Sequence, residues 1–327
     1  MTVSTVVDRC AALARAHGEP VAGSASRARR WLLVEQPGAW GRDALRESGL
    51  PTRVADHLDV LRRDLPARVL MLRRTSRVDS ASDARGADAS DARGSDGATR
   101  TSRTVFAGVS HPGGGGWLER FHLDDVSQLV DLDLSGLAVG RSVGGEPVTD
   151  PLYLICTNGK HDACCATFGL PVARAVRDLV GDRAWECSHT GGDRFAGNLV
   201  CLPDGIFYGH LDAATAIAPV QAHEAGRILP GVCRGRSSLP FPVQAAELLA
   251  RERLGLDALD ALRYLGVERA GETFTVRFAL VDGRELAATV QRGRDPHERL
   301  MACGGQVGAP PTYDLIRLQL EQGPSLE

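Results

Sequence analysis

Short apolar runs alternate with polar, turn-rich segments along most of the chain, which is typical of an α/β protein with buried strands. Apolar runs bounded by turn residues predict strands, and apolar positions three or four apart predict helices. In the first half these patterns predict strands at 31–34, 67–72, 104–109 and 117–123, and helices at 54–64 and 125–131.

The second half repeats this order of elements. It predicts a strand at 152–155, a helix at 170–180, a strand at 183–187, a hairpin of 198–202 with 206–210, and a helix at 219–228. The order β-α-β-β-β-α is that of thioredoxin-like domains. We therefore predict an α/β fold of two tandem thioredoxin-like domains, each a mixed sheet flanked by helices.

The last third predicts an accessory C-terminal helical and β-hairpin region. Its pattern indicates helices at 242–254 and 257–265, a hairpin of 273–280 with 286–290, and a final strand at 314–320. The expected division is a degenerate thioredoxin-like domain at 1–148, a domain carrying the chemistry at 149–230, and the accessory region at 231–327.

Residues 75–103 differ from the rest of the chain. They are nearly all Ser, Asp, Ala, Arg, Gly and Thr, and the pentad Ser-Asp-Ala-Arg-Gly occurs at 82–86 and again at 90–94. Such a segment has almost nothing to bury, so we predict a disordered insertion, with a docking segment as the alternative.

Composition and charge narrow the function classes. A net charge of -3 disfavours nucleic-acid binding, which needs a clustered basic excess. No run of eighteen apolar residues predicts a membrane span, and the N-terminus lacks the pattern of a secretory signal. Without a signal or span we expect a cytoplasmic protein, and the heavy use of Ala, Arg, Gly and Asp is typical of bacterial coding bias. In a reducing compartment, eight cysteines favour metal binding, redox chemistry or burial over disulfides.

The candidate chemistry lies where two apolar strands are expected to end. Cys156 and Cys165 flank a loop after the first of these strands, and His189 follows the second. Gly191 and Gly192 would let the backbone pass close to the site, and Asp193 could reach the same centre. Thiolates select zinc or iron–sulfur centres over hard cations, so we predict a metal or redox centre here.

A mixed cysteine and histidine set suits a [2Fe–2S] cluster whose two irons have different ligands. Neutral imidazoles in place of thiolates lower the negative charge of such a cluster and raise its potential. Lys160 and Arg194 are the expected cofactor-binding residues, because their charges could offset that of the cluster.

These residues also resemble a known family. Cys156-x8-Cys165 followed by Ser-His-Thr-Gly-Gly-Asp-Arg-Phe-Ala-Gly-Asn at 188–198 resembles the sucrase/ferredoxin-like family, a branch of the thioredoxin-like ferredoxins. The similarity continues at 35–41 and 235–247. It implies a [2Fe–2S] electron-transfer protein. In relatives within this family, two cysteines spaced like Cys156 and Cys165 hold one iron, and two histidines spaced like positions 189 and 193 hold the other. Nothing in the chain is typical of a glycosidase carboxylate pair.

This chain has aspartate at position 193, so the fourth ligand stays open. The candidates are Asp193, Cys187, Cys164 and Cys303. The remaining cysteines are expected to be structural, and His161 and His210 to be surface or supporting groups. The basic segment at 234–236 is expected to be a solvated turn, with docking of an acidic partner as the alternative.

Two other functions compete with electron transfer. A thiol–disulfide oxidoreductase could use Cys164, Cys165 or Cys156, although no Cys-x-x-Cys opens a helix. A structural zinc site in an interaction module is the other alternative. We expect a redox carrier rather than a stand-alone enzyme, with a reductase or electron acceptor as its protein partner and no nucleic-acid or membrane partner.

Overall fold

The computed structural model describes residues 9–75 and 102–321. The insertion predicted at 75–103 therefore lies almost wholly outside the described residues. None of the described helices is both long and apolar enough to cross a membrane.

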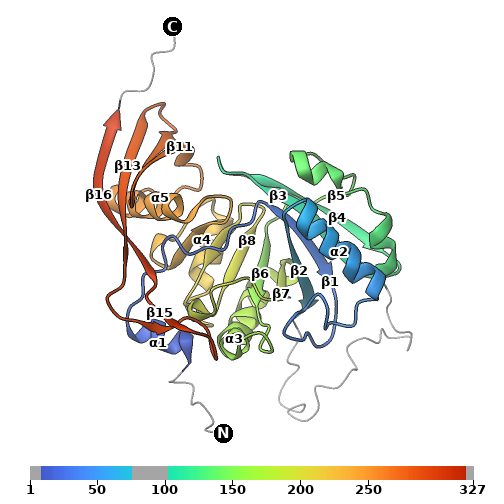
Figure 1. The fold of residues 1–327 in the computed structure, drawn as a ribbon. Helices are drawn as coiled ribbons and strands as arrows, with labels where there is room; N and C mark the ends of the chain where they lie inside the picture. Colours follow the sequence, from blue (N-terminus) through green and yellow to red (C-terminus); the bar gives the residue numbers. More distant parts are fainter. Residues whose placement is uncertain (1–8, 76–101, 322–327) are drawn as a thin grey trace.

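One large mixed sheet dominates the described part of the chain (Figure 1). Its ten strands follow the order β10-β9-β8-β6-β7-β2-β1-β3-β4-β5. The strands are β1 (Arg30–Glu35), β2 (Ala67–Arg74), β3 (Arg103–Ser110), β4 (Gly116–Leu123), β5 (Glu146–Pro147), β6 (Leu152–Cys156), β7 (Ala184–Cys187), β8 (Leu199–Leu202), β9 (Ile206–Tyr208) and β10 (Cys233–Arg236).

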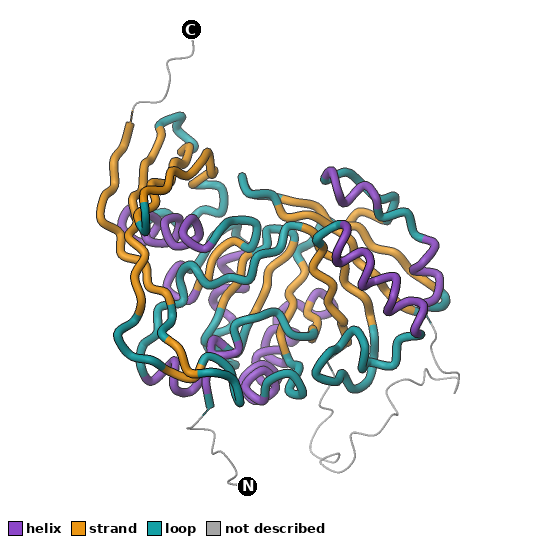
Figure 2. The backbone as a smooth tube through the Cα atoms, viewed as in Figure 1, coloured by secondary structure: helices purple, strands orange, loops and turns teal. Residues whose placement is uncertain are grey.

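Helices and short 3-10 turns precede, connect or follow these strands (Figure 2). The α-helices are α1 (Cys10–Ala16), α2 (Thr52–Asp64), α3 (Ala163–Val180), α4 (Ile217–Glu224) and α5 (Phe241–Leu254). The 3-10 helices are η3 (Val126–Asp131), η4 (Ser135–Val139), η5 (Gly181–Arg183), η6 (Asp193–Phe195) and η7 (Pro230–Val232).

The sheet consists of two units with the same strand pairing. In the first, β1 pairs parallel with β2 and antiparallel with β3, which pairs with β4. In the second, β6 pairs parallel with β7 and antiparallel with β8, which pairs with β9. The units join through antiparallel pairing of β2 with β7, which places Leu72 beside Cys187. The α/β prediction and the repeated order are confirmed, but the two units share one continuous sheet.

The central strands are buried on both faces, which explains their uninterrupted apolar sequences. In β1, Trp31 and Leu33 belong to one apolar cluster, while Leu32 and Val34 pack with α2 on the other face. In the second unit, α3 packs in the same way on alternate residues of β6. Both helices therefore cover the same face of the sheet.

Helix α3 begins earlier than predicted. The sequence pattern placed its start near Leu170, because the apolar residues at helical spacing are Val172, Val176, Leu179 and Val180. The structure starts the helix at Ala163, and Asp162 caps it by accepting a hydrogen bond from the Cys164 amide at 2.8 Å. Cys164 and Cys165 therefore lie in the first turn of a helix rather than in a loop.

The C-terminal region forms a separate antiparallel sheet of β11 (Leu262–Ala270), β12 (Thr273–Leu280), β13 (Glu285–Arg294) and β16 (Pro311–Glu321), in that order. Helix α5 packs against it, and the predicted 273–280 hairpin is confirmed. The helix predicted at 257–265 is wrong, because from Leu262 onward the chain pairs along β12 as an edge strand. The short pair β14 (Arg299–Leu300) and β15 (Val307–Gly308) lies beside α1 (Figure 1).

Candidate metal centre

Two strand ends and one helix start bring the predicted ligands together. Cys156 is the last residue of β6, and its neighbour in register on the parallel strand β7 is Cys187, the last residue of that strand. The chain leaves β6, turns, and enters α3, whose first turn returns Cys165 to the end of β6. His189 lies two residues beyond the end of β7.

The ligand atoms of Cys156, Cys165 and His189 all lie within 4.8 Å of one another. Asp193 adjoins this group, because its Oδ1 lies 3.4 Å from the Cys165 Sγ and 3.1 Å from the His189 Nδ1. The His189 Nδ1 is 3.9 Å from the Cys165 Sγ. The structure thus gathers two sulfurs, one imidazole and one carboxylate at a single place.

The centre is buried on the cysteine side and open on the histidine side. Cys156 is 1% exposed and Cys165 is fully buried, whereas the His189 side chain is 20% exposed. His161 stacks on His189 with ring centroids 3.7 Å apart and an interplanar angle of 15°. His161, expected to be a surface or supporting group, is close enough to belong to an overlapping group with His189 and Asp193.

The pKa values of the two thiols are shifted in opposite directions. A hydrogen bond from Cys165 holds the pKa of Cys156 well below its usual value, and His189 and the Thr190 amide act in the same direction. The pKa of Cys165 is raised, because it donates that hydrogen bond and is buried. Burial also raises the pKa of Asp193. Of the two thiols, Cys156 therefore loses its proton more readily, and metal binding to both would release protons.

A glycine pair shapes the loop that carries His189. Gly191 and Gly192 have φ values of +92° and +81°, a conformation that favours glycine. A Cβ at Gly191 would overlap the Ser26 hydroxyl, and one at Gly192 would overlap the Arg234 guanidinium. The close approach seen here is to Ser26 and Arg234, and the expected passage of the backbone close to a bound group stays a prediction.

Two arginines, the partly buried Arg68 and the buried Arg234, hold this loop, and the sequence patterns did not identify them. Arg68 of β2 donates to the His189 carbonyl at 3.0 Å. Arg234 is 1% exposed and donates to the Gly191 carbonyl at 3.0 Å and to Asn198 Oδ1 at 2.7 Å. The prediction of a solvated turn at 234–236 is wrong, because these residues form β10 and are buried.

The other predicted site residues lie at different places. Cys187 is fully buried in an apolar cluster with Cys156, outside the close groups of ligand atoms found among the described residues. Lys160 is exposed in the loop after β6. Arg194 pairs instead with Glu19, with its Nε 2.6 Å from the carboxylate.

Residues of the first unit pack against the loop that follows Cys156. Asn158 donates to the Gly41 carbonyl at 3.2 Å, and the Arg73 guanidinium lies 4.4 Å from the centre of the Trp40 ring. A groove of about 360 Å³ runs between the 39–40 segment and the 157–160 loop. The loop that lacks ligand residues thus supports the loop that has them.

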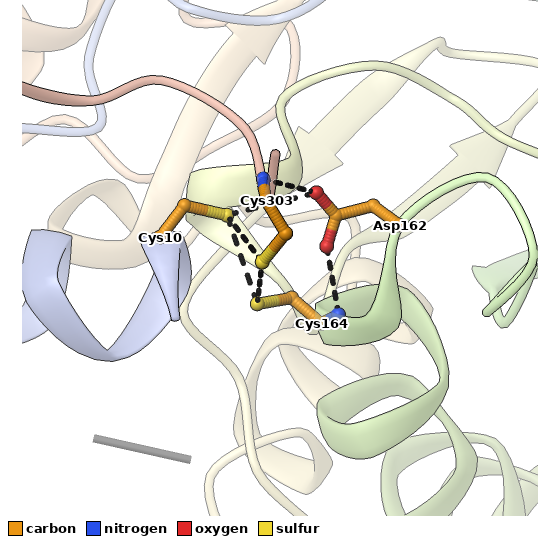
Figure 3. Close-up of side chains that lie close together, drawn as sticks. All are labelled: Cys10, Asp162, Cys164 and Cys303. Carbon is orange, nitrogen blue, oxygen red and sulfur yellow. Dashed lines mark hydrogen bonds between the residues drawn. The ribbon is translucent and has the colours of Figure 1, made fainter. Parts of the chain in front are cut away.

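Cys164 and Cys303, both candidates for the fourth ligand, do not join this centre. They meet Cys10 and Asp162 in a second cluster (Figure 3). The four residues come from α1, the start of α3 and the turn between β14 and β15, so no local spacing in the sequence could have predicted the cluster.

The fold and the site define an α/β protein with a cysteine- and histidine-containing candidate metal centre on a large mixed sheet. The model of the sucrase/ferredoxin-like family matches residues 21–235, about two thirds of the chain, and the protein belongs to that family. The predicted resemblance is confirmed. No curated protein and no solved structure gives a significant match.

Proposed function

We propose that the protein is an electron carrier with a [2Fe–2S] cluster bound by Cys156, Cys165, His189 and Asp193. The observation that carries the proposal is the convergence of two sulfurs, an imidazole and a carboxylate at neighbouring strand ends in a member of this family. In type, these donors fit a cluster with thiolates on one iron and harder ligands on the other.

The assignment follows from the positions of the side chains. Cys156 and Cys165 form the buried side and would hold one iron, while His189 and Asp193 form the side nearer the surface and would hold the other. Such a cluster supplies one-electron redox chemistry when bound. An imidazole on the exposed side would couple reduction to protonation, because a neutral histidine ligand can titrate.

The closeness of three of these ligands supports a second candidate, a single zinc ion. The ligand atoms of Cys156, Cys165 and His189 lie within 4.8 Å of one another, and the Asp193 carboxylate lies 3.1 Å from His189, a spacing that suits one tetrahedral ion. The protein would then be a zinc-containing interaction module. Thiol–disulfide exchange has less support, because Cys156 and Cys165 are both buried from a protein substrate.

The strand pairing supports the assignment of two tandem thioredoxin-like domains. Each unit has a parallel βαβ pair followed by an antiparallel hairpin, with the first strand between the second and third. We retain 1–148, 149–230 and 231–327 as the proposed division of the chain. Among the described residues, the first domain then supplies no ligand to this centre and supports the second through β2, Arg68 and the 36–41 loop.

The exposed edge of His189, with the stacked ring of His161, is the proposed place where electrons enter or leave. The partner would be a reductase or an electron acceptor in the cytoplasm. Docking through Arg234 and Arg236 is not part of this proposal, because both side chains are buried.

The deciding experiment is iron and acid-labile sulfide analysis of anaerobically purified protein, with EPR spectroscopy after reduction by dithionite. Two irons and two sulfides per chain with a reducible chromophore would support the cluster. A colourless protein with one zinc at this centre would support the zinc module instead.

Matched variants test the ligands. Cys156→Ala and Cys165→Ala should each abolish iron binding, while Cys201→Ala, a buried cysteine of β8 outside the centre, should retain it. Asp193→His should keep the cluster and raise its reduction potential, because a neutral imidazole replaces an anionic carboxylate. Full iron content and an unchanged spectrum in both ligand variants would refute the assignment.

A further inference from the structure

A second group of metal-binding side chains lies outside the centre described above. The sulfurs of Cys10, Cys164 and Cys303 form a triangle with sides of 3.6, 3.4 and 3.6 Å. The Asp162 carboxylate completes the group, and all four ligand atoms lie within 4.8 Å of one another. Figure 3 shows the three sulfurs pointing toward one another with the carboxylate beside them.

We propose that Cys10, Cys164, Cys303 and Asp162 form a structural site for one zinc ion. This site is separate from the proposed cluster and does not depend on it. Two of its three cysteines, Cys10 and Cys303, lie outside the residues matched by the family model, so family membership does not imply it.

The spacing of the sulfurs fits one ion of this size. Zinc–sulfur bonds are about 2.3 Å long, and tetrahedral angles then place two sulfurs about 3.8 Å apart. The observed triangle would hold an ion about 1 Å above its plane at that bond length. An ion so placed needs a fourth ligand on its open side, which a carboxylate oxygen can provide.

The same distances argue against other uses of three thiols. A disulfide joins two sulfurs about 2.05 Å apart and leaves the third aside, whereas these three separations are nearly equal and favour no pair. The sulfurs also touch one another, which leaves no room between them for a multi-iron cluster. A soft, tetrahedral, redox-inactive ion is the occupant that this donor set selects.

Asp162 is held in place as a metal-ligating carboxylate usually is. Its Oδ1 accepts from the Cys164 amide at 2.8 Å, and its Oδ2 accepts from the Cys303 amide at 2.7 Å while lying 3.8 Å from the Cys10 sulfur. Hydrogen bonds of this kind orient ligands before metal arrives. Apolar side chains, including those of Phe168 and Leu300, pack around the group.

The proposed ion would join three distant parts of the chain. Cys10 belongs to α1, Cys164 to the start of α3, and Cys303 to the turn after β14, with separations of 154 and 139 residues along the chain. Zinc would therefore tie α1 and the β14–β15 turn to helix α3 of the second unit. Cys164 is adjacent to Cys165 in α3, so the ion would also brace the helix turn that presents a ligand to the first centre.

Zinc analysis of the purified full-length chain and its variants tests the proposal. The wild-type protein should hold one zinc after dialysis into zinc-free buffer, and Cys10→Ala and Cys303→Ala should each lose it. Cys233→Ala, a buried cysteine in neither group, is the matched control and should keep it. Retention of zinc by both ligand variants, or a zinc-free wild-type protein, would overturn the proposal.

Two further measurements separate this site from the first centre and from folding failure. Cys156→Ala should keep this zinc whether or not the protein binds iron, and loss of zinc there with retention in Cys10→Ala would place the ion in the first centre. In the wild-type protein, zinc should protect the half-buried Cys303 from alkylation, and a chelator should remove that protection. Equal alkylation with and without zinc would contradict the site.

Discussion

Arg234 is the side chain on which the loop of His189 depends, and replacing it by methionine is a direct test. The guanidinium donates to the Gly191 carbonyl, to Asn198 Oδ1, to the Ser24 carbonyl at 2.6 Å and to the Ser24 hydroxyl at 3.2 Å. Arg234→Met keeps much of the volume and removes every one of these donors.

The structure sets the size of the effect. Each buried acceptor left without a donor costs about 1–3 kcal/mol, and three main acceptors lose theirs. Burial lowers the pKa of Arg234 to about 9, which shows that the charge is held at a cost. Removing that charge offsets part of the loss. We therefore expect a decrease in the free energy of unfolding of about 2–4 kcal/mol.

Urea denaturation followed by circular dichroism measures this change, and metal analysis of the same samples reports on the loop. Arg183→Met is the matched control, because Arg183 pairs with Glu224 near the surface and should cost only about 0–1 kcal/mol. If Arg234→Met unfolds within about 0.5 kcal/mol of the wild-type protein, the hydrogen-bond argument fails.

Three other changes have defined outcomes. Gly192→Ala should lower the free energy of unfolding by at least about 1–2 kcal/mol and reduce metal content, because the new Cβ would overlap Arg234. The control Gly226→Ala has φ +68° and open space around it, so it should show only the cost of that backbone conformation. Glu247→Gln should lower stability by about 3–5 kcal/mol, because the carboxylate pairs with two buried arginines; an unchanged urea midpoint would contradict this. Burial and then the Arg15 charge lower the pKa of His210 to about 3, so its contribution to stability is present above pH 6.5 and is lost as pH falls. The His210 contribution to the free energy of unfolding should fall by about 2 kcal/mol between pH 7 and pH 5. His210→Phe should remove that part of the pH dependence, which urea unfolding at several pH values measures.

Local sequence was sufficient to predict most strands of the large sheet and the first centre. The strands are short apolar runs bounded by turns. Because they are buried on both faces, nearly all their residues are apolar, and each strand can be recognised from its own sequence. Cys156, Cys165 and His189 each lie within a few residues of a strand end, so the order of the elements alone places them near one another.

Other features depended on the partners that folding supplies. The 257–265 segment has apolar spacing that suits a helix, but pairing with β12 makes it a strand from Leu262 onward. Arg234 and Arg236 have the composition of an exposed turn, and they are buried because acceptors from distant segments surround their guanidinium groups.

The sequence by itself determined the repeated order of strands and helices, the family, and the pairing of two cysteines with a histidine, because each of these rests on short-range patterns. Only the tertiary structure decided that the two units share one sheet and that Cys10, Cys164 and Cys303 meet. The reason is physical: contacts between residues some 150 positions apart are set by the packing of whole elements, and no local spacing records them.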